Sequence, residues 1–71
     1  MNDDHTYRLY NLSREGAIRG AESGSFRDDA EAIGRARQLL QHHQAVEIWQ
    51  TDRLVGLLRQ DQGYTDAQTR A

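Results

Sequence analysis

Few residues of this 71-residue chain have the spacing that catalysis or metal binding requires. His42 and His43 are adjacent, and adjacent residues of a helix point about 100° apart, which suits two separate contacts better than one metal ion. A histidine near the end of a helix is also explained by the negative end of the helix dipole. The chain has no cysteine, so it offers no thiolate ligand and no disulfide. We therefore expect no metal site.

Hydrolytic catalysis needs a nucleophile that is oriented by a base. Ser13, Ser23 and Ser25 all lie in turn-like sequence, and none stands in a nucleophile elbow. The carboxylate pair Asp28 and Asp29 is explained by the start of a helix. The chain has no phosphate-binding loop and no lysine to serve one. We expect no catalytic residue and no cofactor, and an enzyme whose site forms between subunits stays as an alternative.

The predicted strands carry aromatic side chains with arginines nearby, and a sheet of this kind could stack nucleobases as sheet-type RNA-binding modules do. These residues are Tyr7, Tyr10, Trp49, Arg8, Arg19 and Arg53. The net charge of −2 gives no general attraction to phosphates, and the sequence lacks the motif of the sheet-type RNA-binding modules. Binding of single-stranded nucleic acid is therefore an alternative function rather than the leading one.

The apolar blocks predict four strands, over residues 6–12, 17–22, 45–49 and 53–58. Gly16 supplies the positive φ that closes a short hairpin with a bulge between the first two strands. Residues 51 and 52 are a polar break between the last two, short enough for a tight hairpin although it lacks the preferred glycine.

Between the two strand pairs the sequence predicts a helix over residues 29–41. Asp28 is a good N-cap, and Glu31 three residues later completes a capping box. One apolar stripe faces inward with spacings of three and four. Its members are Ala32, Ile33, Ala36, Leu39 and Leu40. Gly34 within this helix suggests a close approach to the sheet.

The order of elements predicts an α+β fold of the ββαββ type: a four-stranded, mainly antiparallel sheet with one helix on one face. We expect a single domain over residues 6–59, with a disordered N-terminus (1–5) and a disordered polar tail (60–71). The first residues show no signal-peptide pattern, and no apolar run approaches the length of a membrane span, so we expect a cytoplasmic protein.

One helix of this length can cover one face of a four-stranded sheet and no more. Several strands nevertheless carry apolar side chains on both faces, so some must remain on the helix-free side. This pattern predicts a contact surface for a homodimer or another protein partner. The predicted interface residues are Tyr7, Tyr10, Trp49, Arg53, Val55 and Leu57. In the alternative interpretation, the tail or the loops cover this surface and the chain is a monomer.

Three runs carry a resemblance: Tyr-Arg-Leu-Tyr from residue 7, Asp-Asp-Ala-Glu-Ala from residue 28, and Val-Glu-Ile-Trp from residue 46. Over residues 7–58 the chain resembles short, uncharacterised α+β proteins that are common in alphaproteobacteria. The resemblance implies a fold and transfers no catalytic role. This chain differs from them in its longer polar tail.

Overall fold

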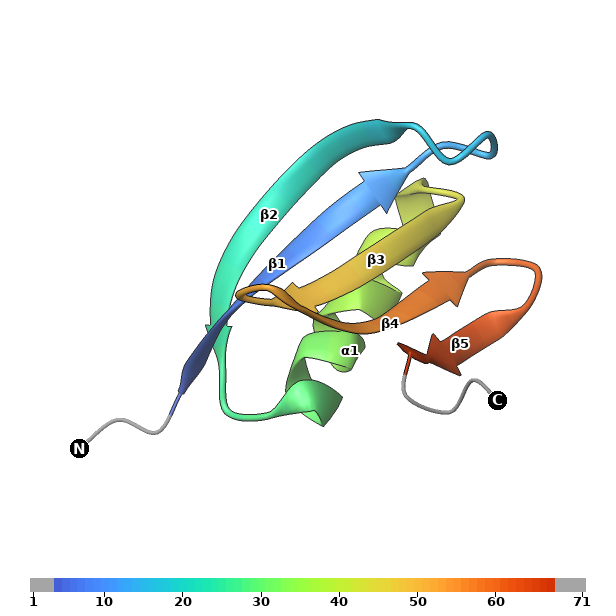
Figure 1. Cartoon of the computed structure of the whole chain (residues 1–71). Helices are drawn as coiled ribbons and strands as arrows, with labels where there is room; N and C mark the ends of the chain where they lie inside the picture. Colours follow the sequence, from blue (N-terminus) through green and yellow to red (C-terminus); the bar gives the residue numbers. More distant parts are fainter. Residues whose placement is uncertain (1–3, 68–71) are drawn as a thin grey trace.

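The structure, a computed structural model, describes residues 4–67, in which five strands and one α-helix form (Figure 1). The strands are β1 (His5–Leu12), β2 (Ile18–Phe26), β3 (Ala45–Gln50), β4 (Arg53–Arg59) and β5 (Gly63–Asp66). The helix α1 spans Asp29–Leu39 and continues into the short 3-10 helix η1, Leu40–His42. The predicted α+β class with one helix is confirmed.

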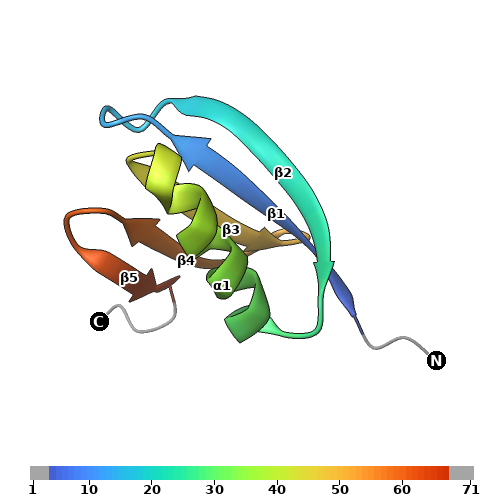
Figure 2. The same cartoon turned by 180° about the vertical axis from the view of Figure 1, so that it is seen from behind.

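The five strands form one sheet in the order β2-β1-β3-β4-β5, and every pair of neighbours is antiparallel. After β2 the chain crosses one face of the sheet as α1 and returns as β3 on the other side of β1 (Figure 2). The molecule therefore has two layers, a sheet and a single helix. This arrangement leaves the second face of the sheet without a helix among residues 4–67 (Figure 1).

The predicted sheet lacked its fifth strand. Residues 63–66 fall in the segment expected to be a disordered tail, yet they pair with β4 over Gly56–Arg59. The sequence of this segment is polar apart from Tyr64, so it gave no apolar pattern to detect. Residue 5 likewise belongs to β1 rather than to a disordered end. Residues 1–3 and 68–71 lie outside the described part of the chain.

The first hairpin closes as the sequence predicted. Gly16 has a φ of +88°, which a residue with a side chain rarely adopts. The amide of Ser13 donates to the carbonyl of Ala17 at 2.8 Å, and the strand register shifts at Leu12. In the second hairpin Thr51 takes the positive φ, +56°, in place of the glycine that is usual there.

The helix begins at the predicted cap. Asp28 accepts a hydrogen bond from the amide of Glu31 at 3.0 Å, and Glu31 in turn accepts one from the amide of Arg27 at 2.7 Å. The first contact gives a partner to the amide of Glu31, one of those that the first turn of a helix leaves unpaired. The second gives a partner to the amide of Arg27, which precedes the cap residue. The helix ends at Leu39, two residues earlier than predicted, because its last turn tightens into η1.

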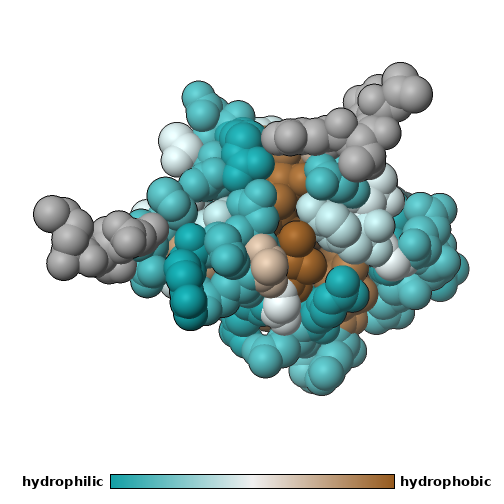
Figure 3. Space-filling view, turned by 90° about the horizontal axis from the view of Figure 1, so that it is seen from below, coloured by the Kyte–Doolittle hydropathy of each residue, from teal (hydrophilic) through white to brown (hydrophobic). Residues whose placement is uncertain are grey.

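The core lies between the helix and the sheet. The two fully buried helix residues are both alanines, Ala32 and Ala36, which let the helix axis lie close to the strands. The strands contribute the larger buried side chains Tyr7, Leu9, Val46, Ile48, Val55 and Leu58. Seen from below, apolar surface is confined to a narrow area framed by hydrophilic residues (Figure 3). The core is thin, which makes each contact around it count for stability.

Gly34 does not approach the sheet, contrary to the sequence-based expectation. A Cβ built at this position meets no heavy atom within 4 Å, so only the helix propensity distinguishes glycine from alanine there. We expect Gly34→Ala to stabilise the protein by about 1 kcal/mol. Urea unfolding followed by circular dichroism measures this gain, and a loss of stability would contradict an open environment at Gly34.

Candidate functional site

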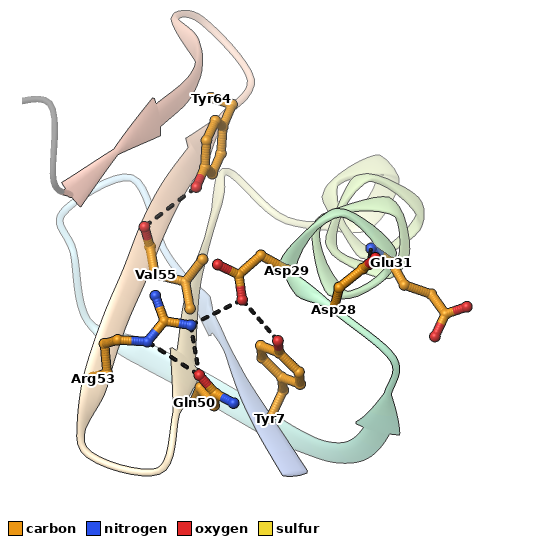
Figure 4. A network of polar contacts seen from close by, with 8 residues as sticks. All are labelled: Tyr7, Asp28, Asp29, Glu31, Gln50, Arg53, Val55 and Tyr64. Carbon is orange, nitrogen blue, oxygen red and sulfur yellow. Dashed lines mark hydrogen bonds and ion pairs between the residues drawn. The ribbon is translucent and has the colours of Figure 1, made fainter. Parts of the chain in front are cut away.

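A polar network joins the start of α1 to the strands β1 and β4 (Figure 4). One carboxylate oxygen of Asp29 accepts hydrogen bonds from the Tyr7 hydroxyl at 2.7 Å and from the Arg53 guanidinium at 2.9 Å. Arg53 also donates to the side-chain oxygen of Gln50, its cross-strand partner, at 3.0 Å. The network thus connects four residues from three strands and the helix.

The ionisation of this network suits a structural role. Burial, together with the hydrogen bond to Asp29, raises the pKa of Tyr7 to about 12. The hydrogen bond from Tyr7, with that from Arg53, lowers the pKa of Asp29 below its usual 3.8. The same carboxylate raises the pKa of the Arg53 guanidinium. None of these three groups has its pKa shifted towards pH 7, which is where the pKa of a general acid or base is most effective.

A second tyrosine fastens the edge strand β5. The Tyr64 hydroxyl donates to the carbonyl of Val55 at 3.2 Å, and its ring packs against the core cluster (Figure 4). Burial raises the pKa of Tyr64 above 10.0. Gly56, paired with Asp66, makes room for this strand, because a Cβ there would lie 2.7 Å from the carbonyl oxygen of Thr65.

The helix-free side of the sheet carries a second group of residues, which we call the open face. Its members alternate with core residues along β1, β3 and β4 and pair directly across these strands. They are Arg8, Tyr10, Glu47, Trp49, Leu54 and Leu57. The four apolar members are half-buried rather than fully exposed, because neighbouring side chains on the sheet shield one another. No helix or strand of the described chain lies over them (Figure 1).

The structure places three of the six predicted interface residues on the open face and three elsewhere. Tyr10, Trp49 and Leu57 lie on it. Tyr7 faces the helix and is only 1% exposed. Arg53 also lies on the helix side, where it binds Asp29 rather than standing at the rim of a contact surface.

Val55 was assigned to the wrong face because of a β-bulge. Ile48 pairs with Gly56 and Trp49 pairs with Leu54, so Val55 is the extra residue on β4. A bulge of one residue turns the side chains beyond it to the opposite face. Val55 consequently enters the core at 3% exposure, and Leu54 takes its place on the open face beside Trp49. Strict alternation did not indicate this bulge, although Gly56, next to Val55, is a residue that often marks a bulge inside a strand.

A groove of about 650 Å³ runs along the open face. Its walls include Arg8, Tyr10, Glu47 and Trp49, together with Thr51 and Asp52 of the turn between β3 and β4. The Trp49 indole N–H donates to Glu47 at 2.9 Å, which fixes the ring on the surface of the sheet. Arg8 lies opposite Trp49 and is exposed, and it forms no ion pair with any residue between 4 and 67.

Ile18 adds apolar surface to the same groove. It is the one large hydrophobic residue of the described chain that is exposed, at 62%. It begins β2 opposite Leu12, just beyond the register shift. The sequence predicted Ile18 on a strand and a bulge in the first hairpin, but it did not indicate Ile18 in the contact surface, because the position of the bulge within the strand pair was not predicted.

The two adjacent histidines line a different, polar hollow at the other end of the sheet. His42 and His43 share it with Arg14 and Arg19. Gln60, on the same hollow, donates to the carbonyls of Leu40 and His43, which closes the end of η1. Within residues 4–67, no three histidine, aspartate or glutamate side chains are grouped so as to hold a metal ion.

The fold, the polar network around Asp29 and the open face together define the class of protein. It is a two-layer α+β protein with one helix and one sheet face that no helix covers in the described residues. Comparison with protein-family models, with curated proteins and with solved structures finds no match to this chain. The resemblance to short alphaproteobacterial proteins therefore stays a prediction from sequence. Among the described residues, no helix is both long and apolar enough to cross a membrane.

Proposed function

We propose that this chain is a cytoplasmic, non-enzymatic protein-interaction module that self-associates through the open face. One observation carries the proposal: Tyr10, Trp49, Leu54 and Leu57 lie together on a sheet face over which the described chain places no helix or strand. A small domain with a thin core gains much from covering such a surface.

The charges of the open face suit a second copy of itself. Arg8 and the carboxylates Glu47 and Asp52 line the same groove. In a two-fold contact each surface meets its own copy, so both sides bring an arginine and carboxylates, and a contact that sets Arg8 of one chain against a carboxylate of the other forms that pair twice. A partner that is uniformly acidic or uniformly basic would instead meet like charges on this face.

The polar network supports the non-enzymatic part of the proposal. Tyr7, Asp29 and Arg53 satisfy one another, and their pKa shifts favour the neutral tyrosine and the charged pair at neutral pH. In this proposal the network holds the helix on one face of the sheet, and the open face on the other side stays accessible.

The first test of self-association is solution mass, measured by light scattering across a concentration series. We expect a dimer for the unmodified protein and at least about a tenfold weaker dimer for Trp49→Ala, because a buried aromatic residue is a frequent hot spot. Arg8→Glu should weaken the dimer as well, and more strongly at low salt.

Arg37→Glu is the matched control for the charge reversal, because Arg37 is exposed on the helix and remote from the open face. Circular dichroism establishes that each variant is folded. A mass that stays monomeric at all concentrations for the unmodified protein would refute self-association, and an unchanged dimer in both Trp49→Ala and Arg8→Glu would refute the open face as its site.

A second candidate function is binding of single-stranded nucleic acid. The observation in its favour is Arg8, which is exposed and stands beside Trp49 and Tyr10 in one groove. Stacking on these rings would quench Trp49 fluorescence in a salt-dependent manner, and Arg8→Ala would reduce the effect. Arg53 plays no part in this version because it lies on the helix side. The absence of Trp49 quenching at low salt would exclude binding of single-stranded nucleic acid at this groove.

A further inference from the structure

The outer edge of the sheet is formed by β2, the longest strand. It has nine residues and pairs only with β1, so alternate residues direct their backbone N–H and C=O groups away from the sheet. Nothing else in the described chain runs along this side (Figure 2). The opposite edge, β5, has four residues.

Between Gly20 and Phe26 this edge has few of the features that normally keep edge strands from pairing with another chain, whereas Arg19 and the register shift lie near its start. It contains no proline and no lysine, which are common guards of such edges. Glu22 is its single acidic residue, and it is held by Arg35 of the helix at 2.6 Å. The remaining side chains between Gly20 and Ser25 are small, so they leave the backbone accessible.

We propose that β2 pairs with β2 of a second copy of this chain, antiparallel and with the two-fold axis at Ser23. In this register Ser23 faces Ser23 of the partner, and the numbers of any two facing residues add up to 46. Ala21 then lies opposite Ser25, and Glu22 and Phe26 lie opposite Gly24 and Gly20. Within residues 20–26 the two large side chains thus each face a glycine, and small side chains face small ones. At the ends of the pairing, Ile18 and Arg19 lie opposite Asp28 and Arg27 of the partner, which are beyond the end of its β2.

The neighbouring registers are less favourable. An axis at Glu22 would place the two glutamates directly opposite each other, where like charges destabilise an antiparallel pair. An axis at Gly24 would set glycine against glycine and Glu22 against Phe26. The Ser23 register avoids both, and it joins the two sheets into one with both helices on the same side.

This inference is independent of the proposed function, because the edge lies on β2 whereas the centre of the open face lies on β3 and β4. A chain that uses both contacts would form a larger assembly than a dimer. A chain that uses only the edge would keep the open face free in the joined sheet.

Cysteine crosslinking tests the register, since the chain has no cysteine of its own. In the Ser23→Cys variant the two thiols face each other at the axis, within the Cα separation of about 4.4–6.8 Å that a disulfide spans. In Ser25→Cys, the matched control, the two thiols are about four residues apart along the strands, roughly 13 Å. Both positions are exposed serines of the same strand.

We expect mild oxidation to crosslink Ser23→Cys at least about tenfold faster than Ser25→Cys, and urea to abolish the difference. An equimolar mixture of Ala21→Cys and Ser25→Cys should crosslink to each other rather than to themselves. Equal rates for Ser23→Cys and Ser25→Cys in the folded state would overturn the proposal. So would a monomeric mass for the unmodified protein at the highest soluble concentration.

The Trp49→Ala background separates the two contacts. If Trp49→Ala lowers the solution mass but leaves the Ser23→Cys crosslink intact, both the edge and the open face are used. If the crosslink forms and Trp49→Ala has no effect on mass, the edge stands and the open-face dimer fails. If the crosslink does not form, the edge pairing fails whatever the mass of the Trp49→Ala variant.

Discussion

Replacing Gly56 by alanine should displace β5 from the sheet. The new Cβ would lie 2.5 Å from the Tyr64 hydroxyl oxygen and 2.7 Å from the backbone oxygen of Thr65. The hydroxyl is at the end of a side chain and has room to move, whereas the backbone oxygen moves only with the strand. We expect a loss of about 1–3 kcal/mol in the free energy of unfolding, as for other overpacked sites. Urea unfolding measures the loss, and amide exchange of residues 63–66 locates it.

Gly34→Ala serves as the control, since it makes the same chemical change in open space and has the opposite expected sign. Adding Tyr64→Phe to Gly56→Ala removes the closest contact along with the bond to Val55, so the two losses should combine to less than their sum. Unchanged stability in Gly56→Ala with protected amides in β5 would show that the strand tolerates a Cβ at this place.

Replacing Asp29 by alanine should have the second large effect, because one carboxylate holds two partners. The Tyr7 hydroxyl belongs to a residue that is 1% exposed and would lose its acceptor. A buried donor left without a partner costs about 1–3 kcal/mol. Asp29→Asn keeps an acceptor for Tyr7 while it removes the charge that pairs with Arg53, so its effect should be smaller. Urea unfolding at neutral pH measures both variants.

The difference in stability between the unmodified protein and Asp29→Ala should depend on pH in the acid range, because the pKa of Asp29 is lowered in the folded protein. A carboxyl whose pKa is lower in the folded state stabilises the protein above its unfolded pKa, 3.8, and this contribution is lost as the pH falls through the folded value. The gap in stability between the unmodified protein and Asp29→Ala should therefore narrow as the pH falls from neutral through 3.8 and below. A gap that stays constant over this range would mean that the charge of Asp29 contributes nothing.

Glu22→Ala is the comparison for this experiment. Glu22 binds Arg35, and that bond lowers its pKa in the same way. This ion pair and the pair of Asp29 with Arg53 are both partly exposed, but Asp29 in addition accepts a hydrogen bond from the buried Tyr7. An exposed ion pair contributes little, typically below about 1 kcal/mol. Its removal should cost less than the removal of Asp29.

Local signals in the sequence were read correctly where the determinant is itself local. Asp28 and Glu31 cap the helix as their spacing predicts, because a cap involves residues three or four positions apart. Gly16 carries the positive φ of the first hairpin for the same reason. Both depend on the conformational preferences of a few neighbouring residues.

The candidate site was predicted only in part, because the parts that were missed depend on contacts between residues far apart in the sequence. Asp29 was explained as part of a helix start, and nothing in the sequence links it to Tyr7 or Arg53, 22 and 24 positions away. Leu54 and Val55 lie on the faces opposite to those predicted, because β4 has a bulge that depends on its pairing with β3. Tyr64 looked like a lone aromatic in a polar tail until β4 supplied its partner.

The sequence by itself determined the α+β class, the single helix with its cap, the first hairpin and the excess of apolar side chains over what one helix can cover. These follow from local conformational preference and from the period of the hydrophobic pattern. The tertiary structure alone decided which side chains form the open face, that β2 is a free edge, and that a polar segment adds a fifth strand. The physical reason is that strand pairing, bulges and cross-strand hydrogen bonds join residues far apart in the chain, and their energies exist only once those residues meet.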